Sequence, residues 1–132
     1  MLTYWEMGDI IIGVDSKGVA ELTSAAPFFI IRAGGIIVLK IIAEFFVKPE
    51  STDAAMKLAK ELVTKTQKEQ GCIAYNLFAD NENDSHIVII EEWHSQEVLD
   101  MHSASDHFLQ LVPAIAALCE KDPSVRTFTK IV

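Results

Sequence analysis

Basic residues are scarce in this sequence. Lys and Arg together number 11 against 19 Asp and Glu, which gives a net charge of −8. Binding to nucleic acids and to anionic membrane surfaces depends on basic side chains that neutralise phosphate groups. The charge balance therefore argues against both as partners.

Cysteine is also rare. The two residues, Cys72 and Cys119, are far apart, lie in apolar runs and lack the spacing of a metal or redox motif. Buried free thiols are typical of a reducing compartment, and residues 1–9 contain no basic stretch of the kind that opens a secretory signal. These features predict a cytoplasmic protein.

The sequence has no uninterrupted hydrophobic run of membrane-spanning length. Its longest apolar stretch, residues 25–47, is broken by Arg32, Lys40, Glu44 and the Gly34-Gly35 pair, so no transmembrane helix is expected. A glycine-rich phosphate loop and a Gly-x-Ser-x-Gly elbow are missing as well.

The sequence also lacks a pair of histidines at the spacing of metal ligands on a helix. The four histidines are His86, His94, His102 and His107, and no two of them are four residues apart, as a ligand pair on one helix would be. Neither cysteine accompanies them. The pattern predicts no metal site.

Hydrophobic residues, in contrast, make up 50% of the 132 residues, which is one domain's worth of chain. Such an excess favours an apolar surface covered by a second copy of the chain.

Gly34-Gly35 is the one plausible boundary between two parts of the chain. Before it, residues 9–14 and 19–23 flank a glycine-containing turn and predict a β-hairpin, with a possible short strand at 28–31. Residues 1–35 are therefore treated as an N-terminal extension of unknown role, and 36–132 as the domain.

The domain has a regular pattern of elements. Apolar β-branched runs predict strands at 36–47, 72–79, 86–93 and 125–132. Helical spacing predicts a helix from Ser51 or Thr52 through Gln70, a second at 96–102, and a third that begins after Ser103 or Ser105. The order β-α-β-β-α-β is that of a ferredoxin-like α+β fold, an antiparallel sheet with helices on one face. The other face is also apolar, which favours a homodimer.

Several short motifs occur in a fixed order along this domain. They are Glu69-Gln70-Gly71-Cys72 leading to Tyr75, then Glu91-Glu92-Trp93, then His102 and Ser105-Asp106-His107-Phe108. Together they resemble the antibiotic biosynthesis monooxygenase family, including its quinol monooxygenase-like group. The resemblance implies a dimeric α+β barrel with a pocket between sheet and helices in each subunit. It also implies oxidation of a small aromatic, phenolic or quinol-like substrate by dioxygen without metal, flavin or haem.

Site residues follow from the same resemblance. His102 and His107 match the family's histidine pair, and either could be the base, since histidine titrates near neutral pH. On one continuous helix they would lie about 140° apart, so they share a pocket only if the helix breaks near residues 103–105. Tyr75 would orient a substrate oxygen. The expected substrate-binding residues are Trp93, Glu91, Phe108 and Phe78.

Structural roles compete with these assignments. Trp93 and Tyr75 could simply pack in the core, a histidine near a helix start often bonds only to backbone, and Glu91 could form an ion pair at an interface. Two other functions also fit the fold. One is an isomerase of a small phosphorylated signalling sugar, for which Arg126 or Lys130 would bind the phosphate; the other is a non-catalytic small-molecule-binding or stress-response domain.

Overall fold

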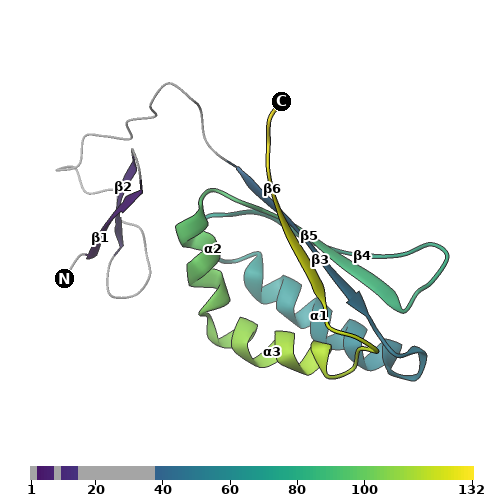
Figure 1. Ribbon diagram of the computed structural model, residues 1–132. Coiled ribbons are helices and arrows are strands. Elements are labelled where there is room, and N and C mark those ends of the chain that lie inside the picture. The colour runs from purple at the N-terminus through teal and green to yellow at the C-terminus, as the bar shows by residue number, and fades with distance from the viewer. Residues whose placement is uncertain (1–2, 8–9, 15–37) are drawn as a thin grey trace. The chain divides into compact units, whose positions relative to one another are not determined.

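The computed structural model describes residues 3–7, 10–14 and 38–132 (Figure 1). The chain divides into two compact units, Met1–Ile36 and Ile37–Val132. In the first unit, strand β1 (Thr3–Met7) pairs antiparallel with β2 (Ile10–Val14). The sequence predicted the β2 strand but did not predict β1, which the structure places antiparallel to it. The predicted strands at 19–23 and 28–31 lie outside the described residues.

The second unit has the predicted β-α-β-β-α-β order. Its elements are β3 (Leu39–Phe46), a short 3-10 helix η1 (Pro49–Ser51), α1 (Thr52–Thr66), β4 (Cys72–Ala79), β5 (His86–Trp93), α2 (Gln96–Ser103), α3 (Asp106–Ala116) and β6 (Ser124–Thr129). The four strands form one antiparallel sheet in the order β4-β5-β3-β6. The ferredoxin-like α+β fold predicted from the sequence is confirmed.

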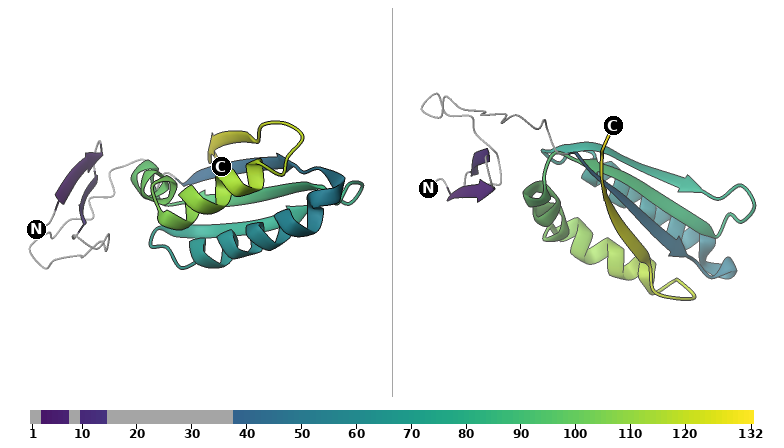
Figure 2. Two further views of the ribbon diagram at one scale, coloured as in Figure 1. Left: turned by 90° about the horizontal axis from the view of Figure 1, so that it is seen from below. Right: turned by 45° about the horizontal axis from the view of Figure 1, so that its top comes forward.

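The helices cover one face of this sheet (Figures 1 and 2). On β5, every second side chain is buried against them: Ile87, Ile89, Glu91 and Trp93. This alternation is the period of a strand with one face in the core. It places the acidic Glu91 on the same inward face as three apolar residues. Within the described residues, no helix combines the length and apolarity that a membrane crossing needs.

The connection between α1 and β4 differs from the prediction. The helix was expected to continue through Gln70, but α1 ends at Thr66. Gly71 adopts a φ of +85°, a left-handed conformation that side chains with a Cβ rarely adopt. A Cβ there would also lie 2.7 Å from Cγ1 of Val98 on α2. Residues 67–70 therefore form a turn that carries Glu69.

The helical region after β5 breaks where the sequence predicted. Ser95 accepts a hydrogen bond from the Val98 N–H and caps α2, and Ser105 accepts one from the Phe108 N–H and caps α3. Each cap satisfies an amide that the first turn of a helix leaves unpaired. His102 thus stands near the end of one helix and His107 near the start of the next.

Candidate functional site

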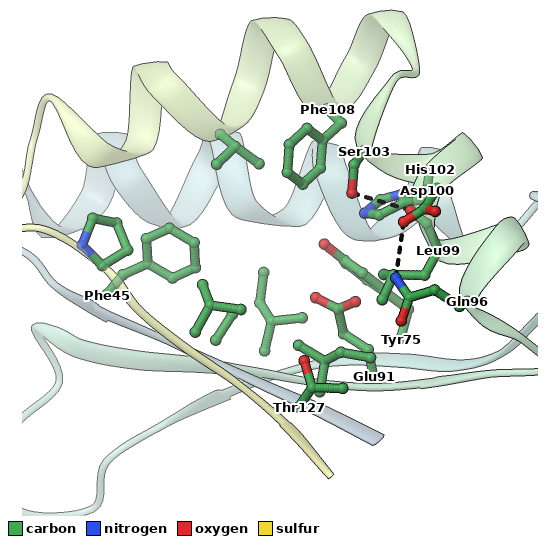
Figure 3. Close-up of a pocket in the computed structure, with 16 residues that line it drawn as sticks. Phe45, Tyr75, Glu91, Gln96, Leu99, Asp100, His102, Ser103, Phe108 and Thr127 are labelled. Atoms are coloured by element: carbon green, nitrogen blue, oxygen red, sulfur yellow. Dashed lines mark hydrogen bonds between the residues drawn. The ribbon is translucent and has the colours of Figure 1, made fainter. Parts of the chain in front are cut away.

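A cavity of about 190 Å³ lies between the sheet and helices α2 and α3 (Figure 3). Much of its lining is apolar and comes from β3, β5, β6 and the two helices. Polar groups are concentrated among the side chains of Tyr75, Glu91, Gln96, Asp100, His102, Ser103 and Thr127. A mostly apolar hollow with a few convergent polar groups is the usual form of a small-molecule site.

The charged groups of this lining are acidic. Among the described residues that line the cavity, none is Lys or Arg. Arg126 lies on β6 next to the lining residue Thr127, but its side chain is 64% exposed and reaches Glu44 at 3.4 Å. Lys130 follows the end of β6 and is exposed. Neither cation is positioned to bind a phosphate in this cavity.

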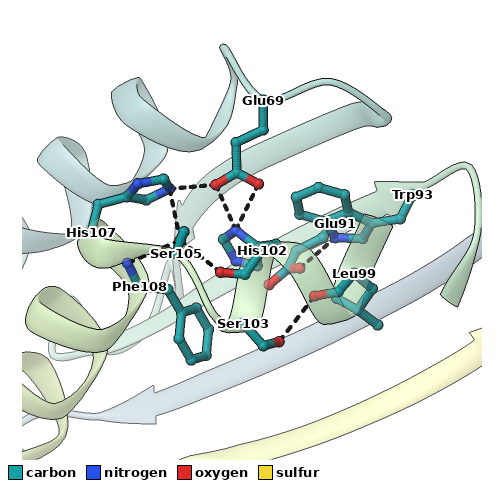
Figure 4. Close-up of polar contacts among 9 residues, drawn as sticks. All are labelled: Glu69, Glu91, Trp93, Leu99, His102, Ser103, Ser105, His107 and Phe108. Atoms are coloured by element: carbon teal, nitrogen blue, oxygen red, sulfur yellow. Dashed lines mark hydrogen bonds and ion pairs between the residues drawn. The ribbon is translucent and has the colours of Figure 1, made fainter. Parts of the chain in front are cut away.

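His102 is the most unusual polar residue of the site. It is 1% exposed, and its Nδ1 lies 3.0 and 3.1 Å from the two carboxylate oxygens of Glu69 (Figure 4). Its Nε2 is buried and has no hydrogen-bond partner among the described residues. A neutral histidine that donates Nδ1–H to a carboxylate keeps a lone pair on Nε2. That nitrogen can accept a proton.

Three aromatic rings surround His102. The ring centroids of Trp93, Phe108 and Tyr75 lie 4.7, 5.0 and 5.4 Å from that of the imidazole. Trp93 is fully buried and is not part of the cavity lining, whereas Phe108 is half-buried and lines the cavity. His102 itself also lines the cavity, beside Phe108.

His107 shares Glu69 with His102. Its Nε2 contacts the same carboxylate oxygen, Oε1, and lies 3.3 Å from Ser105 Oγ. The side chain of His107 is 18% exposed, and it does not line the cavity. The two predicted histidines therefore meet at Glu69, and only His102 reaches the cavity wall.

Glu91 and Trp93 form a second buried pair. The Trp93 Nε1–H donates to Glu91 Oε2 at 2.7 Å, and Glu91 is 5% exposed. Burial raises the pKa of the Glu91 carboxyl above its ordinary value, although Trp93 and the nearby His102 act in the opposite direction. Trp93 lies behind the site and orients Glu91, whereas the sequence predicted it as the cavity wall.

Tyr75 faces the same cavity from β4 and is 2% exposed. Burial, reinforced by the negative charges of Glu91 and Glu69, raises the pKa of its hydroxyl. The hydroxyl therefore remains protonated and can donate a hydrogen bond to a ligand. It is unsuited to act as a base.

Comparison with known proteins identifies the domain. The family model described as "Antibiotic biosynthesis monooxygenase" matches residues 38–114, more than half of the chain. The chain belongs to the antibiotic biosynthesis monooxygenase family. This match includes Tyr75, Glu91 and the Glu69–His102–His107 cluster, but ends before β6, which contributes Val125 and Thr127 to the cavity.

Several known proteins resemble the chain over most of the domain. A solved structure described as an antibiotic biosynthesis monooxygenase is 44% identical, with a TM-score of 0.69, and the match covers 71% of this chain and 99% of that one. A conserved protein from Methanosarcina mazei is 32% identical, with a TM-score of 0.70 and coverage of 73% and 95%. A Mycobacterium tuberculosis protein named "Putative monooxygenase Rv0793" is 28% identical over 85 residues, which cover 64% of this chain and 83% of that protein.

Two features of this monooxygenase-family site differ from the sequence prediction. Phe78, expected to bind substrate, is 50% exposed and does not line the cavity. It lies three positions after the inward Tyr75 on the same strand, and side chains an odd number of residues apart point to opposite faces. Glu69 was not recognised as a site residue. It was part of the motif Glu69-Gln70-Gly71-Cys72 that carried the family resemblance, but no role was assigned to it.

Proposed function

We propose that this chain is a cofactor-independent monooxygenase that oxidises a small phenolic or quinol compound with dioxygen. The proposal rests on the hydrogen bonding of His102 at the cavity wall. Its Nδ1 is held by the Glu69 carboxylate, while Nε2 is buried and unpartnered. This arrangement suits a general base, because the carboxylate fixes the tautomer and stabilises the imidazolium that forms.

The size of the cavity limits the substrate. An apolar cavity of about 150 Å³ holds benzene, and the cavity here measures about 190 Å³. A single aromatic ring with one or two small substituents fits this volume. We therefore favour a monocyclic phenol or hydroquinone over a multi-ring substrate.

The proposed reaction needs only the substrate's own electrons. His102 accepts the phenolic proton, and the phenolate transfers one electron to dioxygen. The phenoxyl radical and superoxide combine at a ring carbon, and the peroxide takes the proton back from His102 to give a hydroperoxide. Loss of water from the hydroperoxide leaves a carbonyl at that carbon, so a phenol and one dioxygen give a quinone and one water.

Two other groups would assist. The Tyr75 hydroxyl, whose pKa is raised, donates a hydrogen bond to the substrate oxygen. Burial also raises the pKa of the Glu91 carboxyl, which makes its ionised form a stronger proton acceptor. Glu91 is the alternative base: a buried carboxylate can accept a proton when a substrate displaces its solvent. The experiment must separate these two candidates.

The test is oxygen uptake by chelator-treated protein with a panel of monocyclic phenols and hydroquinones, measured against spontaneous oxidation without protein. We expect uptake above the spontaneous rate for the wild type and for Glu91→Gln, and its loss in His102→Gln. Uptake retained by His102→Gln and lost in Glu91→Gln would transfer the base to Glu91. No uptake with any substrate from folded protein would overturn the proposal in favour of a binding domain.

The sugar phosphate isomerase alternative has less support. A phosphate group needs cationic or multiple N–H donors, and the described cavity lining offers acidic side chains at Glu91 and Asp100. The isomerase function would require a substrate whose phosphate group brings two negative charges next to these carboxylates. Oxygen uptake separates the readings, because the isomerase reaction consumes none.

We also propose that the chain works as a homodimer in the cytoplasm, the location predicted from its cysteine usage. The sheet face opposite the helices carries two phenylalanines, Phe78 and Phe128, which are 50% and 42% exposed. Pairing this face with that of a second copy would bury both rings. Light scattering of the wild type and of a Phe78→Asp, Phe128→Asp variant tests this: a monomeric wild type would overturn it.

A further inference from the structure

Three ligand-type atoms converge beside the cavity. They are a carboxylate oxygen of Glu69, Nδ1 of His102 and Nε2 of His107, and all lie within 4.8 Å of one another. Each comes from a different segment: the turn after α1, the end of α2 and the start of α3. We propose that this Glu69 cluster binds a divalent transition-metal ion, for which Zn²⁺ and Co²⁺ are suitable probes.

The donor set determines the class of ion. Two imidazole nitrogens and one carboxylate suit Zn²⁺, Co²⁺ and related first-row ions, whereas Mg²⁺ and Ca²⁺ prefer oxygen ligands alone. Bonds of about 2.0–2.2 Å to a tetrahedral ion hold ligand atoms roughly 3.3 Å apart. The distance of 3.0 Å between His102 Nδ1 and Glu69 Oε1 is already close to that separation. Small side-chain rotations would complete the site.

The role of such an ion depends on how exposed its ligands are and on where they lie relative to the cavity. Glu69 and His107 are each 18% exposed, so an ion can enter from solvent and keep a water as its fourth ligand. Neither residue lines the cavity, whereas His102 does. The ion would therefore bind at the Nδ1 edge of His102, through a cluster whose other two members lie outside the cavity. That position favours a regulatory or structural ion over one that contacts the substrate.

Metal binding would change the chemistry of His102. A metal at Nδ1 needs the lone pair of that nitrogen, so the proton of a neutral imidazole moves to Nε2. Nε2 then becomes a hydrogen-bond donor and can no longer accept a proton. The ion and the base are therefore mutually exclusive, and metal binding inhibits oxidation. Inhibition rests on the proposed function; metal binding itself does not.

The competing explanation is a purely hydrogen-bonded cluster. Glu69 can accept an N–H from each histidine, and this arrangement satisfies the carboxylate without an ion. A variant that keeps an N–H donor for Glu69 but removes one metal ligand distinguishes the two explanations. His107→Gln retains an amide N–H for Glu69 and lacks the imidazole.

The experiment titrates chelator-treated full-length protein with Co²⁺, read by its visible absorption, and with Zn²⁺ in competition with a chromogenic chelator. We expect one ion per chain, and His107→Gln, which removes a direct ligand, should lower the affinity by more than the roughly 10- to 100-fold that loss of an outer-shell partner costs. His86→Gln is the matched control, because His86 also lies between two carboxylates, and should bind as the wild type does. Absence of stoichiometric binding, or equal affinity in a folded His107→Gln variant, would overturn the site.

A second pair of measurements separates this inference from the proposed function. Nitrogen NMR of the histidine rings should show the His102 proton shift from Nδ1 to Nε2 when Zn²⁺ is added, with no substrate present. A ring that keeps its tautomer contradicts the metal site. If the tautomer changes and oxygen uptake persists with Zn²⁺ bound, the metal site stands and His102 is not the base.

Discussion

Two histidine–carboxylate clusters lie on opposite faces of the sheet, and they are built differently. In the surface cluster, His86 uses both nitrogens: Nδ1 lies 3.1 Å from Asp80 Oδ2 and Nε2 lies 3.0 Å from Glu44 Oε2. In the buried cluster, His102 uses Nδ1 alone and leaves Nε2 unpartnered. The His86 side chain is 21% exposed, against 1% for His102.

The difference separates a structural histidine from a chemically available one. Hydrogen bonding to Asp80 raises the pKa of His86, with a further contribution from Glu44, so its protonated form donates through both nitrogens. That ring has no free position for a ligand. His102 keeps Nε2 free, and this buried nitrogen has no hydrogen-bond partner within the described part of the chain. An unpaired polar atom of this kind is expected where function requires it.

Exchanging the histidines for glutamine is the strongest test of this comparison. We expect His102→Gln to lower kcat for phenol oxidation about 10²- to 10⁴-fold, because it removes a positioned general base. His86→Gln should leave kcat unchanged. Steady-state oxygen uptake on both folded variants measures the contrast, and equal kcat values would show that the free nitrogen has no catalytic role.

Neutralising the carboxylates gives a smaller effect. Glu69→Gln removes the charge that fixes and stabilises His102, and a hydrogen bond to a charged group contributes about 1.5–3 kcal/mol. We therefore expect kcat to fall about 10- to 100-fold. Glu44→Gln, the corresponding change in the surface cluster, should not alter it. A fully active Glu69→Gln variant would mean that the imidazole needs no partner.

Glu91 extends the comparison to the pH dependence of the stability of the folded chain. Its folded pKa is raised above 4.5, so between that value and the raised one the folded chain holds a proton that the unfolded chain has lost. Stability from this group therefore falls as pH rises through that window. Glu91→Gln avoids the penalty, so its Tm should exceed the wild type's by a few degrees at alkaline pH. The gap should close at acidic pH; a pH-independent gap would contradict the assignment.

The smallest effect belongs to His86. Its folded pKa is raised above 6.5, so the stability that it contributes is fully present below 6.5 and is lost as pH rises through the folded value. His86→Gln should be slightly less stable than the wild type in acid and equal to it in alkali. Urea unfolding at several pH values measures this. A deficit that grew toward alkaline pH would have the wrong sign.

Local patterns were enough to predict most of the fold. Strand periodicity predicted β4 and β5 with their observed bounds. Serine caps predicted the break between α2 and α3, because Ser95 and Ser105 each accept from an amide of the following turn. These signals act over a few residues, which is why the sequence displays them.

The assembly of the site depended on longer-range geometry. Glu69 reaches both histidines because α1 ends at Thr66 and Gly71 is left-handed. Neither feature follows from helical periodicity, which continued the helix to Gln70. The error at Phe78 was different, since strand alternation counted from Tyr75 could have placed it on the outer face. Strand β1 was not predicted, and the predicted partner of β2 at residues 19–23 lies outside the described residues.

The position of Glu69 has a consequence for local unfolding. Its carboxylate lies in the turn before β4 and contacts a histidine at the end of α2 and another at the start of α3. Neither α2 nor α3 can open without losing a contact to that one side chain. The backbone amides of both helices are therefore expected to exchange with solvent as a single cooperative unit. Glu69 therefore has two roles: it orients the imidazole of His102, and it is expected to set how often α2 and α3, which line the cavity, open.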